Sequence, residues 1–266
     1  MKKQDRPTVD PKSILLLCFL LSALLFSSPA PAAEPLTIAS SHWPPFASTI
    51  PGQPGFFNEV VTEAFAISGM EVRYIELPWA RCFQQIKSGR TFGGIPFTKT
   101  AEREEFALFS DALFMTRNPV VFNKRLNPAY DYQGQESLKN YRLLALLGWS
   151  YLEAWKKAGI KYKTVKNQDS AFKMINLDRA ELTVFDEFAA KEYFRKHPEM
   201  GKNIGLSRTP YSNNKMHLMV SRKYPEAHEL VDTFNTNLRQ LKSTGFLDRL
   251  AQKYGFPLEL VLPQEK

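Results

Sequence analysis

Short apolar runs with the period of β-strands alternate along this chain with segments that have the period of helices. Strands that alternate with helices are typical of βαβ units, in which parallel strands form a sheet and the helices cover it. The first three predicted strands are residues 36–40, 72–76 and 93–97, and the others are residues 106–109, 119–122, 143–147, 162–165, 182–185 and 216–221. The pattern therefore predicts an α/β protein with largely parallel sheets.

The composition agrees with a folded protein of this class. Of the 266 residues, 44% are hydrophobic and 23% are charged, which is enough apolar material to bury a core. The formal net charge is +8, but the sequence contains no long basic block. The positive surplus is thus expected to be spread over a solvated surface, and it does not indicate a nucleic-acid partner.

The N-terminus has the features of an export signal. Basic side chains, among them Lys2 and Lys12, precede an apolar run over residues 14–26, and Ala30-Pro31-Ala32 fits a cleavage site. The apolar run is shorter than the ~20 residues that a membrane-spanning helix needs. The sequence predicts a signal peptide over residues 1–32 that is cleaved, and a periplasmic mature protein.

No sequence pattern indicates a metal site, an organic cofactor or a hydrolase. Cleavage would leave Cys82 as the only cysteine, which cannot form an intrachain disulfide or a structural zinc site, and we expect a buried thiol. The histidines have no H-x-x-x-H spacing and the chain has no G-x-S-x-G motif. We predict no cofactor and no metal.

Residues 96–111, with the sequence PFTKTAEREEFALFSD, contain the strongest candidate binding motif. Thr98, Thr100 and Arg103 follow a predicted buried strand, and Phe109-Ser110-Asp111 comes shortly after. A guanidinium group can hold a carboxylate through two parallel hydrogen bonds, which a lysine cannot do. Taken by itself, such a cluster is more often a solvated surface feature.

Other candidate binding residues also follow strand ends. Arg103, Ser150 and Asp186 each come after a predicted strand, and ligands of parallel sheets bind at the carboxyl ends of strands. Two alternatives stay open here. Asp186 could be a helix N-cap, and the aromatic residues Trp43 and Trp79 could belong to the core.

The pattern T-x-T-x-x-R followed by F-S-D, together with the W-P-P-F turn at residues 43–46, resembles the family 3 extracellular solute-binding proteins. The resemblance covers approximately residues 36–255. It implies a two-lobed type II periplasmic binding fold, in which each lobe is a mostly parallel sheet flanked by helices and two hinge crossings join the lobes. The expected division is lobe 1 over residues 33–122 and 218–266, and lobe 2 over residues 123–217.

The resemblance also implies roles for individual residues. Arg103 would take the ligand carboxylate with help from Thr98 and Thr100, and Asp186 would take the α-ammonium group from the other lobe. Trp43 and Trp79 would form the aromatic walls of the site. Gly148-Trp149-Ser150 matches a glycine-plus-hydroxyl turn that offers backbone donors to an anion.

These roles imply a monomeric receptor without catalytic activity, which binds a small carboxylate-bearing solute and delivers it to an inner-membrane ABC permease. The solute would be an amino acid or a derivative. Pro96 lacks an N–H donor and Trp149 is bulkier than the usual residue, which favours an aromatic or modified carboxylate over an ordinary polar amino acid.

Two alternatives to this function remain. The protein could be an orphan ligand sensor in envelope signalling. It could also be a periplasmic enzyme on the same fold, similar to the cyclohexadienyl dehydratases, with Glu153, Glu181 or Glu187 as an acid or base. Each of these glutamates is more readily explained as a surface helix residue.

Overall fold

The computed structural model describes residues 34–261 and residue 263. The predicted signal peptide over residues 1–32 lies outside the described residues. Among the residues that are described, no helix has the length and apolar character needed to cross a membrane.

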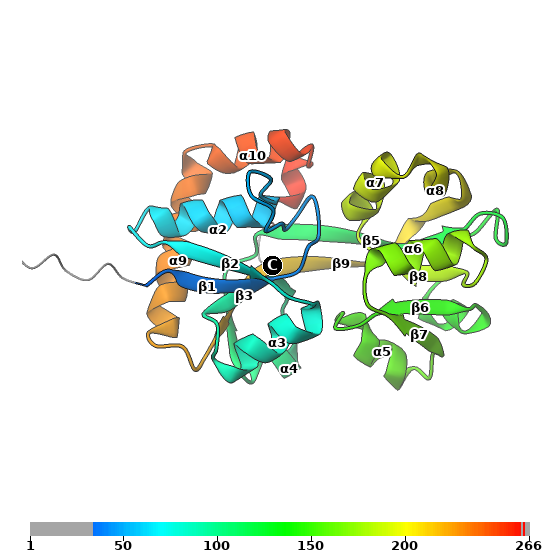
Figure 1. The fold of residues 1–266 in the computed structure, drawn as a ribbon, viewed down its shortest axis with the longest axis horizontal. Coiled ribbons are helices and arrows are strands. Elements are labelled where there is room, and N and C mark those ends of the chain that lie inside the picture. Colours follow the sequence, from blue (N-terminus) through cyan, green and yellow to red (C-terminus); the bar gives the residue numbers. More distant parts are fainter. Residues whose placement is uncertain (1–33, 262, 264–266) are drawn as a thin grey trace, which may run out of the picture. The chain divides into compact units, whose positions relative to one another are not determined.

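The strands form a nine-stranded sheet in the order β2-β1-β3-β9-β5-β8-β6-β7, and β4 pairs with β9 beside this path (Figure 1). The strands are β1 (Leu36–Ser40), β2 (Val72–Glu76), β3 (Gly93–Thr98), β4 (Ala107–Phe109), β5 (Phe114–Asn123), β6 (Leu143–Leu146), β7 (Tyr162–Val165), β8 (Leu182–Val184) and β9 (Ile204–Ser221). Strands β1 to β4 are called the first group below, and β6 to β8 the second group.

Helices pack on both faces of each group (Figure 1). With the first group lie α2 (Phe56–Ala66), α3 (Trp79–Ser88), α4 (Ala101–Glu104), α9 (Ala227–Ser243) and α10 (Phe246–Tyr254). With the second group lie α5 (Tyr151–Lys157), α6 (Gln168–Asn176), α7 (Glu187–Lys196) and α8 (Pro198–Asn203). Two short 3-10 helices span Gln135–Asn140 and Leu258–Leu260. The predicted alternation of strands and helices is confirmed.

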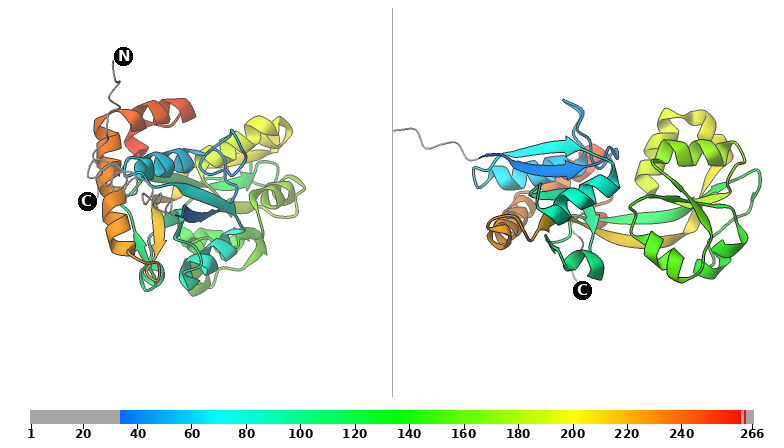
Figure 2. Two further views of the ribbon diagram at one scale, coloured as in Figure 1. Left: turned by 60° about the vertical axis from the view of Figure 1, so that its left-hand side comes forward. Right: turned by 60° about the horizontal axis from the view of Figure 1, so that its bottom comes forward.

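Parallel pairing joins β1, β2 and β3 in the first group and β6, β7 and β8 in the second, whereas β5 and β9 pair antiparallel with each other and with β3, β4 and β8. Strand β1 pairs in parallel with β2 and β3, and β6 pairs in parallel with β7 and β8. Strands β5 and β9 lie side by side and antiparallel, with Phe114 opposite Met216 and Asn123 opposite Ile204 (Figure 2). The prediction of largely parallel sheets is thus correct within the groups.

Strands β5 and β9 are longer than the sequence predicted. We expected strands over residues 119–122 and 216–221, whereas β5 has 10 residues and β9 has 18. The extra length contains polar residues such as Thr116, Asn118 and Asn214, which hide the apolar pattern of a strand. Their backbones are satisfied by pairing between β5 and β9, which are far apart in the sequence.

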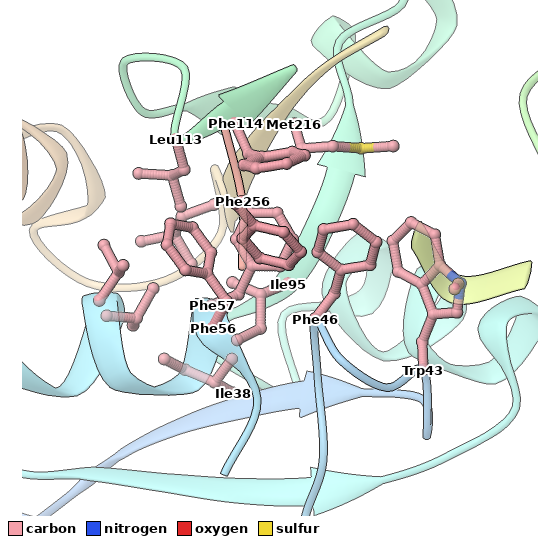
Figure 3. Packing of buried hydrophobic residues seen from close by; sticks show 14 of the residues in the cluster. Ile38, Trp43, Phe46, Phe56, Phe57, Ile95, Leu113, Phe114, Met216 and Phe256 are labelled. Atoms are coloured by element: carbon pink, nitrogen blue, oxygen red, sulfur yellow. The ribbon is translucent and has the colours of Figure 1, made fainter. Parts of the chain in front are cut away.

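Buried aromatic rings form the centre of the main apolar core, next to the candidate site (Figure 3). Phe46 lies 5.2 Å from Phe114 and 5.2 Å from Phe256, measured between ring centroids. Phe56 and Phe57 from α2 complete this group, and both are fully buried. Burying one such side chain contributes about 1.5–3 kcal/mol, so this cluster holds the start, the middle and the end of the chain together.

Gly93 allows β3 and β9 to approach each other closely. A Cβ atom at this residue would lie 2.5 Å from the carbonyl oxygen of Met219, which is shorter than any real contact of a Cβ. The missing side chain at Gly93 therefore serves the pairing of β3 with β9.

Candidate ligand-binding site

A small cavity lies where residues from the first group, the second group and the paired strands β5 and β9 meet. Its lining consists of Trp43, Trp79, Pro96, Phe97, Thr98, Arg103, Asn118, Gly148, Trp149, Ser150, Asn214 and Met216. The structure thus brings together Trp43, Trp79, Thr98, Arg103, Trp149 and Ser150 of the predicted site residues. Thr100 and Asp186 are outside the lining.

The cavity offers about 50 Å³ to the centres of water-sized molecules. One water needs about 10–15 Å³ in this measure, so the cavity holds a few waters in this conformation. Separation of the surrounding elements or a shift of the indole rings would enlarge it for a ligand.

Arg103 is held at the cavity by the short segment that precedes it. Its guanidinium Nη1 donates to the backbone carbonyl oxygen of Thr98 at 2.8 Å and to the hydroxyl of Thr98 at 2.7 Å. The guanidinium carbon lies 5.3 Å from the centroid of Phe97, on whose ring it packs. Thr100 caps α4 by accepting a hydrogen bond from the Arg103 backbone N–H at 3.3 Å. Thr100 therefore positions Arg103 through the backbone.

Arg103 makes no ion pair among the described residues, and the charge of Glu102 offsets only part of the effect of burial on its pKa. The side chain is 7% exposed, and burial lowers the pKa of its guanidinium to about 10, so that it remains charged at neutral pH. A buried charge without a counter-ion is unfavourable. A ligand carboxylate would supply the missing charge.

Three indole rings form the apolar part of the cavity. Trp43 follows β1, Trp79 begins α3 and Trp149 follows β6. Trp43 lies 6.1 Å from Trp79 and 5.9 Å from Trp149, both in edge-to-face arrangements. Trp149 is also stacked on Phe185, with an interplanar angle of 24°. These rings pack together and also line the cavity, and their role as ligand walls stays a prediction.

Gly148 allows the turn that carries Trp149 and Ser150 to approach α3. Its φ of +86° is in the left-handed region, and an added Cβ would lie 3.3 Å from the backbone nitrogen of Ala80. Ser150 is the N-cap residue of α5, but its side chain makes no capping hydrogen bond. Its hydroxyl is therefore available at the cavity.

Asp186 is at the N-terminus of α7, is fully buried and is not among the lining residues. Its Oδ1 accepts a hydrogen bond from the Ala189 backbone N–H at 2.8 Å, as a helix N-cap does. Its Oδ2 is buried and has no hydrogen-bond partner in the described part of the chain. Burial raises the pKa of this carboxyl to about 8. The N-cap alternative considered from the sequence is therefore the geometry that is observed.

Asn118 and Asn214 line the cavity and were missed from the sequence. Both lie in the parts of β5 and β9 that were not predicted as strands. Asn118 Nδ2 donates to the Thr116 hydroxyl at 3.0 Å, and Thr116 is opposite Asn214 in the ladder. The available signal was polar residues on two segments far apart in the sequence, such as Thr116 and Asn118 on one and Asn214 on the other. Only the pairing of β5 with β9 shows that these segments lie side by side.

The glutamates considered as catalytic groups do not line the cavity. Glu181 pairs with Arg142 at 3.1 Å, and Glu187 pairs with Arg117 at 3.2 Å. Glu153 lies in the first turn of α5. Within residues 34–261 and 263, no group of three or more His, Cys, Asp or Glu side chains could hold a metal ion.

Comparison with known families decides the identity of the scaffold. A sequence model of the bacterial extracellular solute-binding proteins, family 3, matches residues 36–257. The chain belongs to this family. The solute-binding protein thus carries the family pattern over almost all of its described length.

Two relatives are named as amino-acid-binding proteins. The L-cystine-binding protein TcyA of Bacillus subtilis is 26% identical over 75% of this chain and 72% of its own length. The histidine-binding periplasmic protein of Escherichia coli strain K12 is 28% identical over 58% of this chain and 60% of its own length. Both relatives are named as binding proteins, and the second is named as periplasmic.

The fold is shared with solved structures. A histidine kinase sensor domain that is similar to periplasmic binding proteins superposes with a TM-score of 0.76, at 15% identity, over 88% of this chain and 100% of that chain. The solute-binding protein therefore has the type II periplasmic binding fold, as the resemblance implied.

Proposed function

We propose that this solute-binding protein binds a small carboxylate-bearing solute, an amino acid or a compound derived from one, in the cavity that contains Arg103. The proposal includes cleavage of residues 1–32, action as a monomer in the periplasm, and delivery of the solute to an ABC permease. Membership of the family and the names of the relatives support the amino-acid class.

One observation carries the proposal. Arg103 is buried at the cavity and makes no ion pair among the described residues, while its Nη1 is fixed by Thr98. A guanidinium in this situation favours an anion with planar, paired acceptors, which is the geometry of a carboxylate. Trp43, Trp79, Trp149 and Ser150 would form the rest of the site.

Binding would require the two groups of strands to separate and close again. We propose that β5 and β9 are the two hinge crossings between lobe 1 and lobe 2. The pairing favours crossings a few residues before each boundary expected from the sequence, because Val120–Phe122 already pair with β8 of the second group and Met216 already pairs with β3 of the first group. Closure would bring Trp149 and Ser150 to the ligand.

We also propose that the protein has no catalytic activity. The cavity lining contains no Asp, Glu or His side chain, so a ligand there would meet no ordinary acid or base. The glutamates that a dehydratase-like reaction would need are in ion pairs or on α5.

A thermal-shift panel tests the proposal. The mature protein is melted with amino acids, keto acids and hydroxy acids, next to Arg103→Ala. A ligand at about 100 times its dissociation constant stabilises the fold by about 2.7 kcal/mol. We expect at least one carboxylate to raise the melting temperature of the wild type, and the same compound to leave the melting temperature of Arg103→Ala unchanged. A shift of equal size in both proteins would contradict the role of Arg103.

A further inference from the structure

We infer that the cavity selects a carboxylic acid whose second polar group accepts a hydrogen bond, and that the indole N–H of Trp43 recognises that group. This inference rests on the proposed function, because it assumes that Arg103 holds the carboxylate. It narrows the solute to an acid with a hydroxyl or keto group next to the carboxylate and a flat apolar body.

The first observation is an unused donor. Trp43 is 4% exposed and lines the cavity, and its Nε1 is buried without a hydrogen-bond partner in the described part of the chain. In Figure 3 the indole of Trp43 lies at the end of the row of buried rings, with its nitrogen turned away from the ring of Phe46. A buried donor without a partner costs about 1–3 kcal/mol, and a ligand oxygen would remove that cost.

The second observation is the imbalance between donors and acceptors. Arg103 and the indole N–H of Trp43 can only donate hydrogen bonds. The other polar side chains of the lining are Thr98, Asn118, Ser150 and Asn214, all uncharged. An oxygen that accepts hydrogen bonds meets two strong donors in this cavity, whereas an ammonium group meets no charged acceptor.

The third observation is the position of Asp186. An α-ammonium group would need an ionised carboxylate, and this aspartate is the one that the family resemblance assigns to it. Asp186 is fully buried and is not part of the lining; its Oδ1 is used by the Ala189 N–H, and its Oδ2 is buried without a partner among the described residues. In this conformation the lining therefore contains no carboxylate.

The apolar part of the lining determines the rest of the ligand. Trp79 and Trp149 pack edge-to-face around Trp43, and Pro96, Phe97 and Met216 complete the apolar surface. Aromatic side chains of this kind favour a planar apolar group, which can stack on one ring and contact the edges of the others. The class that fits is an aryl-substituted 2-hydroxy or 2-oxo acid.

The test uses two probes with one carbon skeleton. L-phenyllactate and L-phenylalanine differ only in a hydroxyl group in place of the ammonium group. Calorimetric titration of the mature protein should show phenyllactate binding at least about ten-fold more tightly, which corresponds to one satisfied buried donor. Tighter binding of phenylalanine, or binding of neither acid, would overturn the inference.

A matched pair of variants locates the effect. Trp43→Phe removes the N–H and keeps a ring, and we expect the preference for phenyllactate to fall to about three-fold or less. Trp79→Phe makes the same change at another indole of the cavity and should change the affinity for both acids by the same factor, so that the preference is kept. Equal preferences in both variants would exclude Trp43 as the donor, and melting curves of both variants confirm that they are folded.

Failure of this inference can be told apart from failure of the proposed function. If another amino acid from the thermal-shift panel binds and its binding requires Arg103, the proposed function is supported. The inference that the cavity prefers a second group that accepts a hydrogen bond is then wrong. If no carboxylate binds in a way that depends on Arg103, both fall.

Discussion

Arg103 Nη1 donates two hydrogen bonds to a single residue, the carbonyl oxygen and the hydroxyl of Thr98, at 2.8 and 2.7 Å. The two residues are separated by the start of α4, which Thr100 caps. One nitrogen of the guanidinium group is thereby fixed, and the ring of Phe97 supports its plane. The remaining donors are oriented before any ligand arrives, which lowers the entropy cost of binding.

The Thr98 hydroxyl is predicted to contribute to affinity through this orientation. Thr98→Val keeps the shape and the carbonyl bond but removes the hydroxyl, and we expect the affinity for a carboxylate to fall by about 5–10-fold. Thr98→Ser keeps the hydroxyl and should bind like the wild type. Calorimetric titration measures both, and equal affinities of the two variants would contradict the role of the hydroxyl.

Asp186 is predicted to make the protein less stable as the pH rises. Burial raises the pKa of this carboxyl from 3.8 to about 8, so between these values the folded state binds a proton that the unfolded state has released. The free energy of unfolding then falls with increasing pH, by at most about 1.4 kcal/mol per pH unit. The contribution of protonated Asp186 to the free energy of unfolding is fully present below about pH 4 and is lost above about pH 8.

Asp186→Asn tests this prediction, because an amide oxygen can still accept from the Ala189 N–H but cannot ionise. Denaturant unfolding is measured from pH 4 to pH 8, and the difference in stability between variant and wild type should grow with pH in favour of the variant. Asp186→Ala, which loses the cap, should also lose about 1 kcal/mol at every pH. Parallel pH profiles for the wild type and Asp186→Asn would exclude this linkage.

Gly93→Ala is predicted to destabilise the sheet. The added Cβ would meet the carbonyl oxygen of Met219 at 2.5 Å, and this oxygen belongs to the backbone of β9 and cannot turn away. We expect a loss of about 1–3 kcal/mol, as for other substitutions that overfill a packed site. Gly201→Ala is the control, since its nearest contact is a side-chain atom of Phe194 at 3.3 Å. Similar melting temperatures for the two variants would contradict the close approach of β3 and β9.

Cys82 is predicted to be unreactive in the folded protein. Its side chain is fully buried, its Sγ donates to the carbonyl oxygen of Leu77 at 3.4 Å, and burial raises the pKa of the thiol to about 12. Because the thiolate is the reactive form, a thiol reagent at pH 8 should label the mature protein only after denaturant is added. Rapid labelling of the native protein would show that α3 opens readily.

Much of the scaffold could be predicted because its signals are local. Most strands of the two groups are short apolar runs, and turns such as Ser88-Gly89 end the helices, with Gly89 in the left-handed conformation at the end of α3. The motif around Arg103 was also local, since Thr98, Thr100 and Arg103 lie within one turn and a strand end.

The part of the cavity lining that β5 and β9 contribute could not be predicted, because its residues come from segments far apart in the sequence. Asn118 and Asn214 are in long strands that exist through their pairing with each other, and their polar side chains interrupt the apolar pattern. Asp186 shows the opposite difficulty. A short local pattern allowed both an N-cap and a ligand contact. The hydrogen bond of Oδ1 shows the N-cap, and the ligand contact stays a prediction.

Titration with an acid and its primary amide tests the central claim, that Arg103 holds a ligand carboxylate, most directly. The acid is the carboxylate with the largest thermal shift, and the amide has the same skeleton without the negative charge. We expect the wild type to bind the acid at least about 100-fold more tightly, and Arg103→Lys to lose most of that preference, because lysine keeps the charge but not the paired donors. Equal binding of acid and amide by the wild type would contradict the account.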